Sequence, residues 1–266
     1  MLLASRFWAD LKTTDFSALD PARAVAVLPV AATEQHGPHL PLSVDQTLVD
    51  GVIAAALPHL AADVPVLFLP TQAVGYSPEH LSFAGTLSLS SATVAATWID
   101  LGECVARAGL KKLLLLNSHG GQVSVMDIVA RELRTRCGLT VYSCSWWNLP
   151  LGAAAEAFSA DEHRFGVHAG EIETSLMLAL RPQFVDMARA QDFSSSSQQR
   201  ALHYSLLGDG RSAKLGWAMQ DYNPAGACGN AAAATADKGG ALLQAAGRQL
   251  AHLLEELSTL PPLVST

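Results

Sequence analysis

The sequence has little of what marks several large classes of protein. It contains only 4 cysteines among 266 residues, and no two of them form a Cys-x-x-Cys pair. We therefore expect neither a disulfide framework nor a thiolate zinc site, and we expect a cytoplasmic protein. Cys104, Cys137, Cys144 and Cys228 are predicted to be core residues.

Positive charge and long apolar runs are also scarce. The chain has 17 Lys and Arg against 24 Asp and Glu, a formal net charge of -7, and no basic patch interleaved with aromatic residues. This balance argues against nucleic acids and anionic membranes as partners and favours small-molecule chemistry. No stretch approaches the roughly 20 uninterrupted apolar residues of a membrane-spanning helix. Met1 to Phe7 lack a basic start and a continuous apolar region, so we expect no secretion signal.

What is present is a strong alternation of strand and helix patterns. A hydrophobic content of 50% allows a sizeable core. The alternation predicts one α/β domain over residues 1–266 with a parallel sheet that helices cover on both faces. Ser194 to Ser197 are typical of a mobile surface loop, or alternatively of a lid. Expected strands lie near 24–31, 65–70, 112–117 and 139–143, and expected helices near 45–57, 90–107, 123–136 and 237–257, with another that opens at Gly170 and Glu171.

Carboxylates and imidazoles follow two of these strands. Glu34 and His36 come after the first strand, and His119 comes after the third. Because side chains alternate in an extended segment, Glu34 and His36 point to the same side. Asp45 lies where the next helix begins. In open α/β sheets ligands collect outside the carboxyl ends of the strands, so the sequence predicts a metal site at this edge.

Four neighbouring residues allow both a functional and a structural interpretation. Gly120 and Gly121 would let the backbone approach a metal or a substrate, although a tight turn from strand to helix would also need glycine. Trp146 and Trp147 end an apolar strand, where core packing is the usual role. If one of these indoles faces the pocket, it would stack on a planar substrate.

Four segments resemble the creatininase (creatinine amidohydrolase) family. They are Thr33 to Leu42 (Thr-Glu-Gln-His-Gly-Pro-His-Leu-Pro-Leu) with Asp45 three residues further on, Ser77 to His80 (Ser-Pro-Glu-His), Asn117 to Gly121 (Asn-Ser-His-Gly-Gly), and His168 to Ser175 (His-Ala-Gly-Glu-Ile-Glu-Thr-Ser). The resemblance implies a three-layer α/β/α sandwich with a mostly parallel central sheet. It also implies a two-metal centre, hydrolysis of a non-peptide carbon–nitrogen bond and a homo-oligomer, often a hexamer.

The resemblance also implies which residues bind the metals. Glu34, Asp45 and His119 match the ligands of one ion, and His36 with the shared Asp45 matches part of the other set. Charge counting favours two ions, because three carboxylates and two neutral imidazoles against two divalent cations leave one positive charge for a bridging hydroxide to neutralise. Oxygen and imidazole donors suit Zn, Mn or Fe(II), and we expect two such ions per chain.

The fifth ligand follows less directly from the resemblance. Creatininase itself takes a glutamate two residues after the histidine of its Asn-x-His segment, where this chain has Gly121. We therefore assign the fifth position, with a catalytic role, to Glu171. Glu173 is the competing residue, and residues two apart on a helix point to nearly opposite sides, so only one of them should face the metals.

The remaining site predictions concern proton transfer and substrate. His168, near a helix start, is the candidate that moves a proton to the leaving nitrogen, although a structural role is also open to it. His80 fits either a surface turn or part of the pocket. The residues that we expect to contact the substrate are Ser77, His80, Gly120, Gly121, Trp146 and Trp147.

The sequence thus predicts a dinuclear metal-dependent amidohydrolase that acts on a small cyclic or linear amide through a metal-bridging hydroxide. The alternatives are a formamide deformylase, a peptidase that trims a redox-cofactor precursor, and a catalytically silent metal-binding scaffold. Ser118, Gln122 and Ala84 depart from the family pattern, so creatinine is not the expected substrate. A phosphoesterase is disfavoured because no Gly-Asn-His-Asp/Glu segment occurs, and a serine hydrolase because no Gly-x-Ser-x-Gly elbow occurs.

Overall fold

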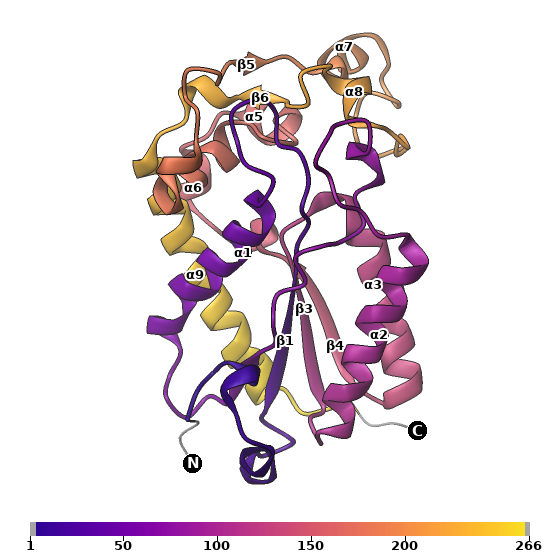
Figure 1. Ribbon diagram of the computed structural model, residues 1–266, viewed down its shortest axis with the longest axis vertical. Coiled ribbons are helices and arrows are strands. Elements are labelled where there is room, and N and C mark those ends of the chain that lie inside the picture. Colours follow the sequence, from indigo (N-terminus) through magenta and orange to yellow (C-terminus); the bar gives the residue numbers. More distant parts are fainter. Residues whose placement is uncertain (1–3, 264–266) are drawn as a thin grey trace.

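A four-stranded parallel sheet forms the centre of the computed structural model, which describes residues 4–263 (Figure 1). The strands are β1 (Val25–Val30), β2 (Val66–Phe68), β3 (Lys112–Asn117) and β4 (Thr140–Ser145), in the order β2-β1-β3-β4. All three neighbouring pairs are parallel. The predicted parallel sheet is therefore confirmed, with strand ends within a few residues of those expected.

Helices cover both faces of this sheet. Helices α2 (Ser91–Arg107) and α3 (Val123–Cys137) lie on one face, and α1 (Val44–Ala56), α6 (Glu171–Leu180) and α9 (Ala236–Thr259) pack together on the other (Figure 1). The three-layer α/β/α arrangement is thus confirmed. The shorter elements are α4 (Ala153–Glu156), α5 (Ala160–Phe165), α7 (Ser196–His203), α8 (Met219–Tyr222) and the antiparallel pair β5 (Asp192–Phe193) and β6 (Gly229–Asn230).

Strand β1 shows why the sheet has two cores. Val25 and Val27 pack into the core beneath α1 and α9, whereas Ala26 and Leu28 pack into the core beneath α2 and α3. Every residue of β1 is buried. An apolar run without polar alternation therefore forms a strand whose two faces are both covered.

The strand order places a crevice where the polar residues were expected. The chain passes from β1 outward to β2 and then returns to β3 on the other side of β1. Adjacent connections that leave in opposite directions open a crevice outside the carboxyl ends of the strands. The segments that follow β1 and β3 carry Glu34, His36 and His119, so the topology brings them to one place.

Two details differ from the sequence predictions. Ser195 caps α7, and Ser195 and Gln198 form a reciprocal capping box, so Ser196 and Ser197 lie in a helix and the predicted loop is wrong for these two residues. Cys228 is buried as expected, but Cys104 is exposed on α2, and all four cysteines are free. Among residues 4–263 no helix is both long and apolar enough to cross a membrane. Residues 1–3 of the N-terminal segment lie outside the described part of the chain.

A buried lysine ties β3 to the end of α9. The Nζ atom of Lys112 donates hydrogen bonds to the carbonyl oxygens of Leu257, at 2.7 Å, and Ser258, at 2.9 Å. These carbonyls belong to the last turn of the helix, where no amide within the helix is available to donate to them. Lys112 therefore acts as a C-terminal cap that comes from the sheet.

Replacing Lys112 with methionine should lower the free energy of unfolding by about 1–3 kcal/mol. Methionine preserves the apolar stem but leaves both carbonyl oxygens without their donor. Urea denaturation of the variant measures the difference, with Lys111→Met as the matched control because Lys111 is exposed. Equal stabilities of the two variants would show that the cap contributes nothing.

Candidate metal centre

Four of the predicted ligands converge at the carboxyl end of the sheet. Glu34 and His36 lie on the loop after β1, Asp45 lies in the first turn of α1, and His119 follows β3. The loop after β1 folds back on itself, since the amide of Glu34 donates to the carbonyl of Leu42 at 3.1 Å. All four side chains are buried, with exposures of 0–3%.

Asp45 lies between the two imidazoles. Its Oδ1 is 3.4 Å from Nε2 of His36, and its Oδ2 is 3.4 Å from Nδ1 of His119. The same Nδ1 atom of His119 is 3.2 Å from Oε1 of Glu34. Each oxygen of Asp45 therefore faces a different group of donors, which is the arrangement that a carboxylate shared by two ions requires.

The donor atoms fit metal ions. Oε2 of Glu34, Nε2 of His36 and Oδ2 of Asp45 are buried without a hydrogen-bond partner. Buried polar atoms are normally paired, and orphaned ones at a cluster of potential ligands indicate an ion. The described residues form four groups of potential ligands with atoms within 4.8 Å of one another, and two of these share Asp45: Glu34, Asp45 and His119, and His36, Asp45 and Glu173. Oxygen and imidazole donors suit Zn, Mn and Fe(II).

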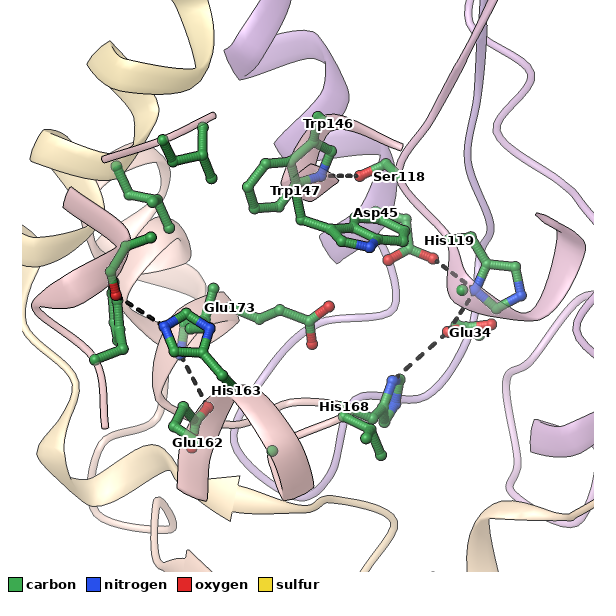
Figure 2. Close-up of a pocket in the computed structure, with 18 residues that line it drawn as sticks. Glu34, Asp45, Ser118, His119, Trp146, Trp147, Glu162, His163, His168 and Glu173 are labelled. Carbon is green, nitrogen blue, oxygen red and sulfur yellow. Dashed lines mark hydrogen bonds and ion pairs between the residues drawn. The ribbon is translucent and has the colours of Figure 1, made fainter. Parts of the chain in front are cut away.

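The second group contains Glu173, the competing residue, in place of Glu171. Oε2 of Glu173 lies 3.9 Å from Nε2 of His36, and its carboxylate points into the cavity (Figure 2). The carboxylate of Glu171 instead forms an ion pair with Nζ of Lys238 on α9. Two residues along a helix correspond to about 200° of rotation, so one glutamate faces the cluster and the other faces α9. In this structure Glu173, and not Glu171, lies at the cluster.

The buried charges strongly perturb the pKa values within the cluster. Burial lowers the pKa of His36, but the hydrogen bond and charge of Asp45 outweigh burial and raise it to about 9. Burial and the charge of Glu34 raise the pKa of Asp45 to about 7. The pKa of His119 is likewise raised, because Glu34 outweighs the effect of burial. In the absence of cations these groups therefore retain protons, which metal ions would displace on binding.

His168 presents one free ring nitrogen to the cluster. Its Nε2 lies 2.7 Å from the carbonyl oxygen of Gln35, so this nitrogen carries the proton and donates it. Burial, reinforced by the positive charge of His36, lowers the pKa of His168 to about 4, which keeps the ring neutral. Its Nδ1 is then an acceptor, and it lies 3.8 Å from Oε1 of Glu34. His168 therefore lies beside the predicted ligands, as expected from the sequence.

His80 supports a ligand, although we expected it to contact the substrate. The amide of Gly37 donates to Oε1 of Gln35 at 2.9 Å, which fixes the orientation of the Gln35 amide. Nε2 of Gln35 then donates to Nδ1 of His80 at 2.8 Å. The remaining nitrogen, Nε2 of His80, carries a proton and faces Oε1 of Glu34 at 3.3 Å. Ser77 is similarly buried, with Oγ 3.3 Å from Nε2 of His119.

Glu79, which together with His80 fits either a surface turn or the pocket from the sequence, turns inward to His119. Its Oε1 is buried without a hydrogen-bond partner and lies 3.3 Å from Nε2 of His119. A Cβ atom at Gly121 would lie 1.8 Å from this oxygen, so only glycine leaves room for the carboxylate. Gly121 thus accommodates Glu79 rather than substrate. The acidic residue beside His80 was the available signal, but nothing local showed that it turns inward.

The centre opens into a cavity of about 390 Å³. Glu34, Asp45, His119, His168 and Glu173 line one side of it (Figure 2). Of the residues expected to contact substrate, Trp146, Trp147 and Gly120 lie on the cavity wall, whereas Ser77, His80 and Gly121 lie behind the ligands. Trp146 is buried, and Trp147 is 37% exposed.

Comparison with known proteins gives consistent matches. The family model described as "Creatininase: Creatinine amidohydrolase" matches residues 9–254. The creatinine amidohydrolase of Pseudomonas putida is 35% identical over 63% of this chain and 68% of its own length. The mycofactocin precursor peptide peptidase of Mycobacterium ulcerans is 30% identical over 66% of both chains. A creatininase variant of Zn–Zn type superposes with a TM-score of 0.71 at 26% identity, covering 96% of this chain and 98% of that one, and a Mn form of creatininase gives the same score and identity over 95% and 98%.

Proposed function

Since the chain belongs to the creatininase family, we propose that it is a dinuclear metal-dependent hydrolase that cleaves a carbon–nitrogen bond in a small amide. At the level of the family, the prediction of a metal-dependent hydrolase acting on carbon–nitrogen bonds is confirmed. The observation that carries the finer proposal is a pair of ligand groups that share Asp45 at the edge of a cavity.

Each ion would have its own set of ligands. Glu34, Asp45 and His119 would hold one ion, and His36, Asp45 and Glu173 the other. Three carboxylates and two neutral imidazoles leave two divalent cations with one residual positive charge. The existence of Mn and Zn–Zn forms among related creatininases supports both the number and the type of ion. When bound, such ions supply a water of lowered pKa and polarise the amide carbonyl.

The protein itself would manage the proton. His168 holds a proton on Nε2 against the Gln35 carbonyl, which leaves Nδ1 free to accept a proton at the cavity. From the same atom the proton would pass to the leaving nitrogen, so that one imidazole serves as base and then as acid. His80, held by Gln35, would keep the Glu34 carboxylate in place.

Replacing His168 with alanine should lower kcat by about 10²- to 10⁴-fold while both metal ions remain bound. Among the described imidazoles that line the cavity, only His119 and His168 face Glu34. Because His119 is proposed as a metal ligand, only His168 remains to carry the proton. Steady-state kinetics and elemental analysis of the purified variant measure the two effects. His203→Ala is the control, because His203 is exposed on α7. An unchanged kcat in a variant that keeps both ions would mean that His168 does not move the proton, whereas absence of turnover in the wild type as well would favour a silent metal-binding scaffold.

The test of the function itself is hydrolysis of amides by metal-loaded protein. A panel of cyclic amides, formamides and short peptides covers the amidohydrolase, deformylase and peptidase alternatives, and the peptidase alternative gains weight from the Mycobacterium ulcerans relative. We expect release of amine that stops on chelation and resumes when Zn or Mn is restored. Metal-loaded protein that hydrolyses no member of the panel would count against the proposal.

Two further predictions from the sequence remain predictions. They are the cytoplasmic location and the homo-oligomer, with the hexamer implied by resemblance to the family. Light scattering coupled to size-exclusion chromatography measures the number of chains directly.

A further inference from the structure

We propose that the substrate carries a neutral aromatic group beside the amide that reacts, and that this group binds in the cavity next to the metal centre. The inference rests on the proposed function, because it places the amide at the metal ligands. It adds the chemical class of the substrate, which membership of the family does not specify.

The wall of the cavity away from the ligands is apolar. It consists of Trp146, Trp147, Leu151, Phe158, Ile172 and Leu242. The rings of Trp146 and Trp147 meet at 87° with centroids 5.8 Å apart. Two indoles at right angles form a corner in which a flat ring can stack on one face and present its edge to the other.

Several polar atoms on that wall are already engaged. Nε1 of Trp146 donates to Oγ of Ser118 at 3.2 Å, and Nε2 of His163 donates to the carbonyl oxygen of Ala155 at 2.8 Å. Figure 2 shows Trp146 joined to Ser118 in this way, and His163 on the side of the cavity opposite His119. Polar atoms that are satisfied within the protein have little to offer a ligand, so this part of the cavity favours hydrocarbon.

The carboxylate of Glu162 is also engaged. It accepts hydrogen bonds from the amides of Ile172, at 3.2 Å, and Asn230, at 3.0 Å. Burial raises the pKa of Glu162, opposed by the hydrogen bonds from these amides. Its role is to join the start of α6 to β6.

No positive side chain is available to an anionic substituent. Among the described residues that line the cavity there is no Lys or Arg. The Nζ atom of Lys238 lies 5.7 Å from the ring centroid of Phe158, but it is paired with Glu171. A carboxylate on the substrate at this position would be desolvated without a counter-charge, which is strongly unfavourable.

The size of the cavity supports a substituent of this kind. A volume of about 390 Å³ lies within the range of about 300–1,000 Å³ that is typical of sites for ligands larger than a few atoms. An acetamide-sized molecule would leave most of the apolar wall in contact with water. A ring beside the amide would instead cover it, and burial of an aromatic side group is worth about tenfold or more in affinity.

Hydroxamates with matched substituents test the inference on wild-type, Zn-loaded protein. The hydroxamate chelates the metals and directs its substituent into the cavity, so calorimetry measures what the wall prefers without any turnover. We expect phenylacetohydroxamate to bind at least about tenfold more tightly than both acetohydroxamate and the para-carboxy derivative. Equal binding of the three compounds, or tightest binding of the carboxylate, would overturn the inference.

The experiment separates this inference from the proposed function. Preference for the phenyl group without hydrolysis of any amide would support the aromatic site and count against the enzyme. Hydrolysis of amides without any preference for an aromatic substituent, in binding or in kcat/KM, would preserve the enzyme and overturn the aromatic site.

A cation placed on the wall gives an independent check. Leu151→Arg should shift the affinity ratio of the phenyl and para-carboxy compounds by about tenfold or more toward the carboxylate. Leu207→Arg is the matched control, because Leu207 is 62% exposed and does not line the cavity. An unchanged affinity ratio in a folded Leu151→Arg variant would contradict the placement of the substrate ring on this wall. If the variant does not fold, the binding of the three hydroxamates to wild-type protein decides whether the inference holds.

Discussion

Replacing Asp45 with asparagine is expected to remove bound metal and to lower kcat/KM for an amide by about 10³-fold or more. Asp45 is the residue common to both ligand groups, with Oδ1 facing His36 and Oδ2 facing His119. Asparagine retains one oxygen but replaces the other with an NH₂ group, which cannot bind a cation. The change also removes one of three negative charges from the centre. The variant should therefore bind both ions more weakly.

Elemental analysis and steady-state kinetics of the purified variant measure these two losses. Asp50→Asn is the matched control, since Asp50 lies on the same helix but is exposed and accepts a hydrogen bond from Thr71. That variant should retain two ions and nearly full activity. An Asp45→Asn protein that still held two ions would mean that Asp45 is not the shared ligand and that the dinuclear proposal is wrong.

The parts of the site that the sequence predicted depend on local order along the chain. Glu34 and His36 lie close together after an unmistakably apolar strand, and Asp45 lies at the start of the next helix. A parallel sheet brings the carboxyl ends of β1 and β3 to the same edge, so His119 joined them without any knowledge of side-chain contacts. The fold class and the convergence of these four side chains therefore followed from pattern alone.

The parts that the sequence could not predict depend on contacts between distant segments. Lys238 lies 67 residues beyond Glu171, yet its ion pair holds the Glu171 carboxylate against α9 and away from the cluster. Glu79 occupies the space beside Gly121, and neither residue indicates the other in the sequence. Alternation and helical periodicity give the direction of a side chain relative to its own element, but not which neighbour lies in that direction.

The serine run is a different kind of failure. Ser195 and Gln198 have the spacing of a capping box, which is a local signal for the start of a helix. The serine-rich composition indicates a loop, whereas the spacing of these two residues indicates a helix start. Here the sequence contained the answer, because the reciprocal hydrogen bonds of a capping box join residues only three apart.

Replacing Glu173 with glutamine should remove one of two bound ions and lower kcat by at least about 10²-fold, whereas Glu171→Gln should retain both ions. Glu173 faces His36 across 3.9 Å, and an amide in its place would leave the ion at His36 and Asp45 with one carboxylate fewer. Glu171 faces Lys238, so its replacement should lower the free energy of unfolding by about 1 kcal/mol without affecting metal content.

The two variants control for each other because they lie two residues apart on the same helix and change the same charge. The Glu173 variant should therefore lose metal, whereas the Glu171 variant should keep its metal and show mainly a lower midpoint of thermal unfolding. Loss of an ion on replacing Glu171 together with two ions in the Glu173 variant would restore the assignment first drawn from the sequence. It would also require α6 to rotate when metals bind, since the present ion pair between Glu171 and Lys238 holds that carboxylate against α9.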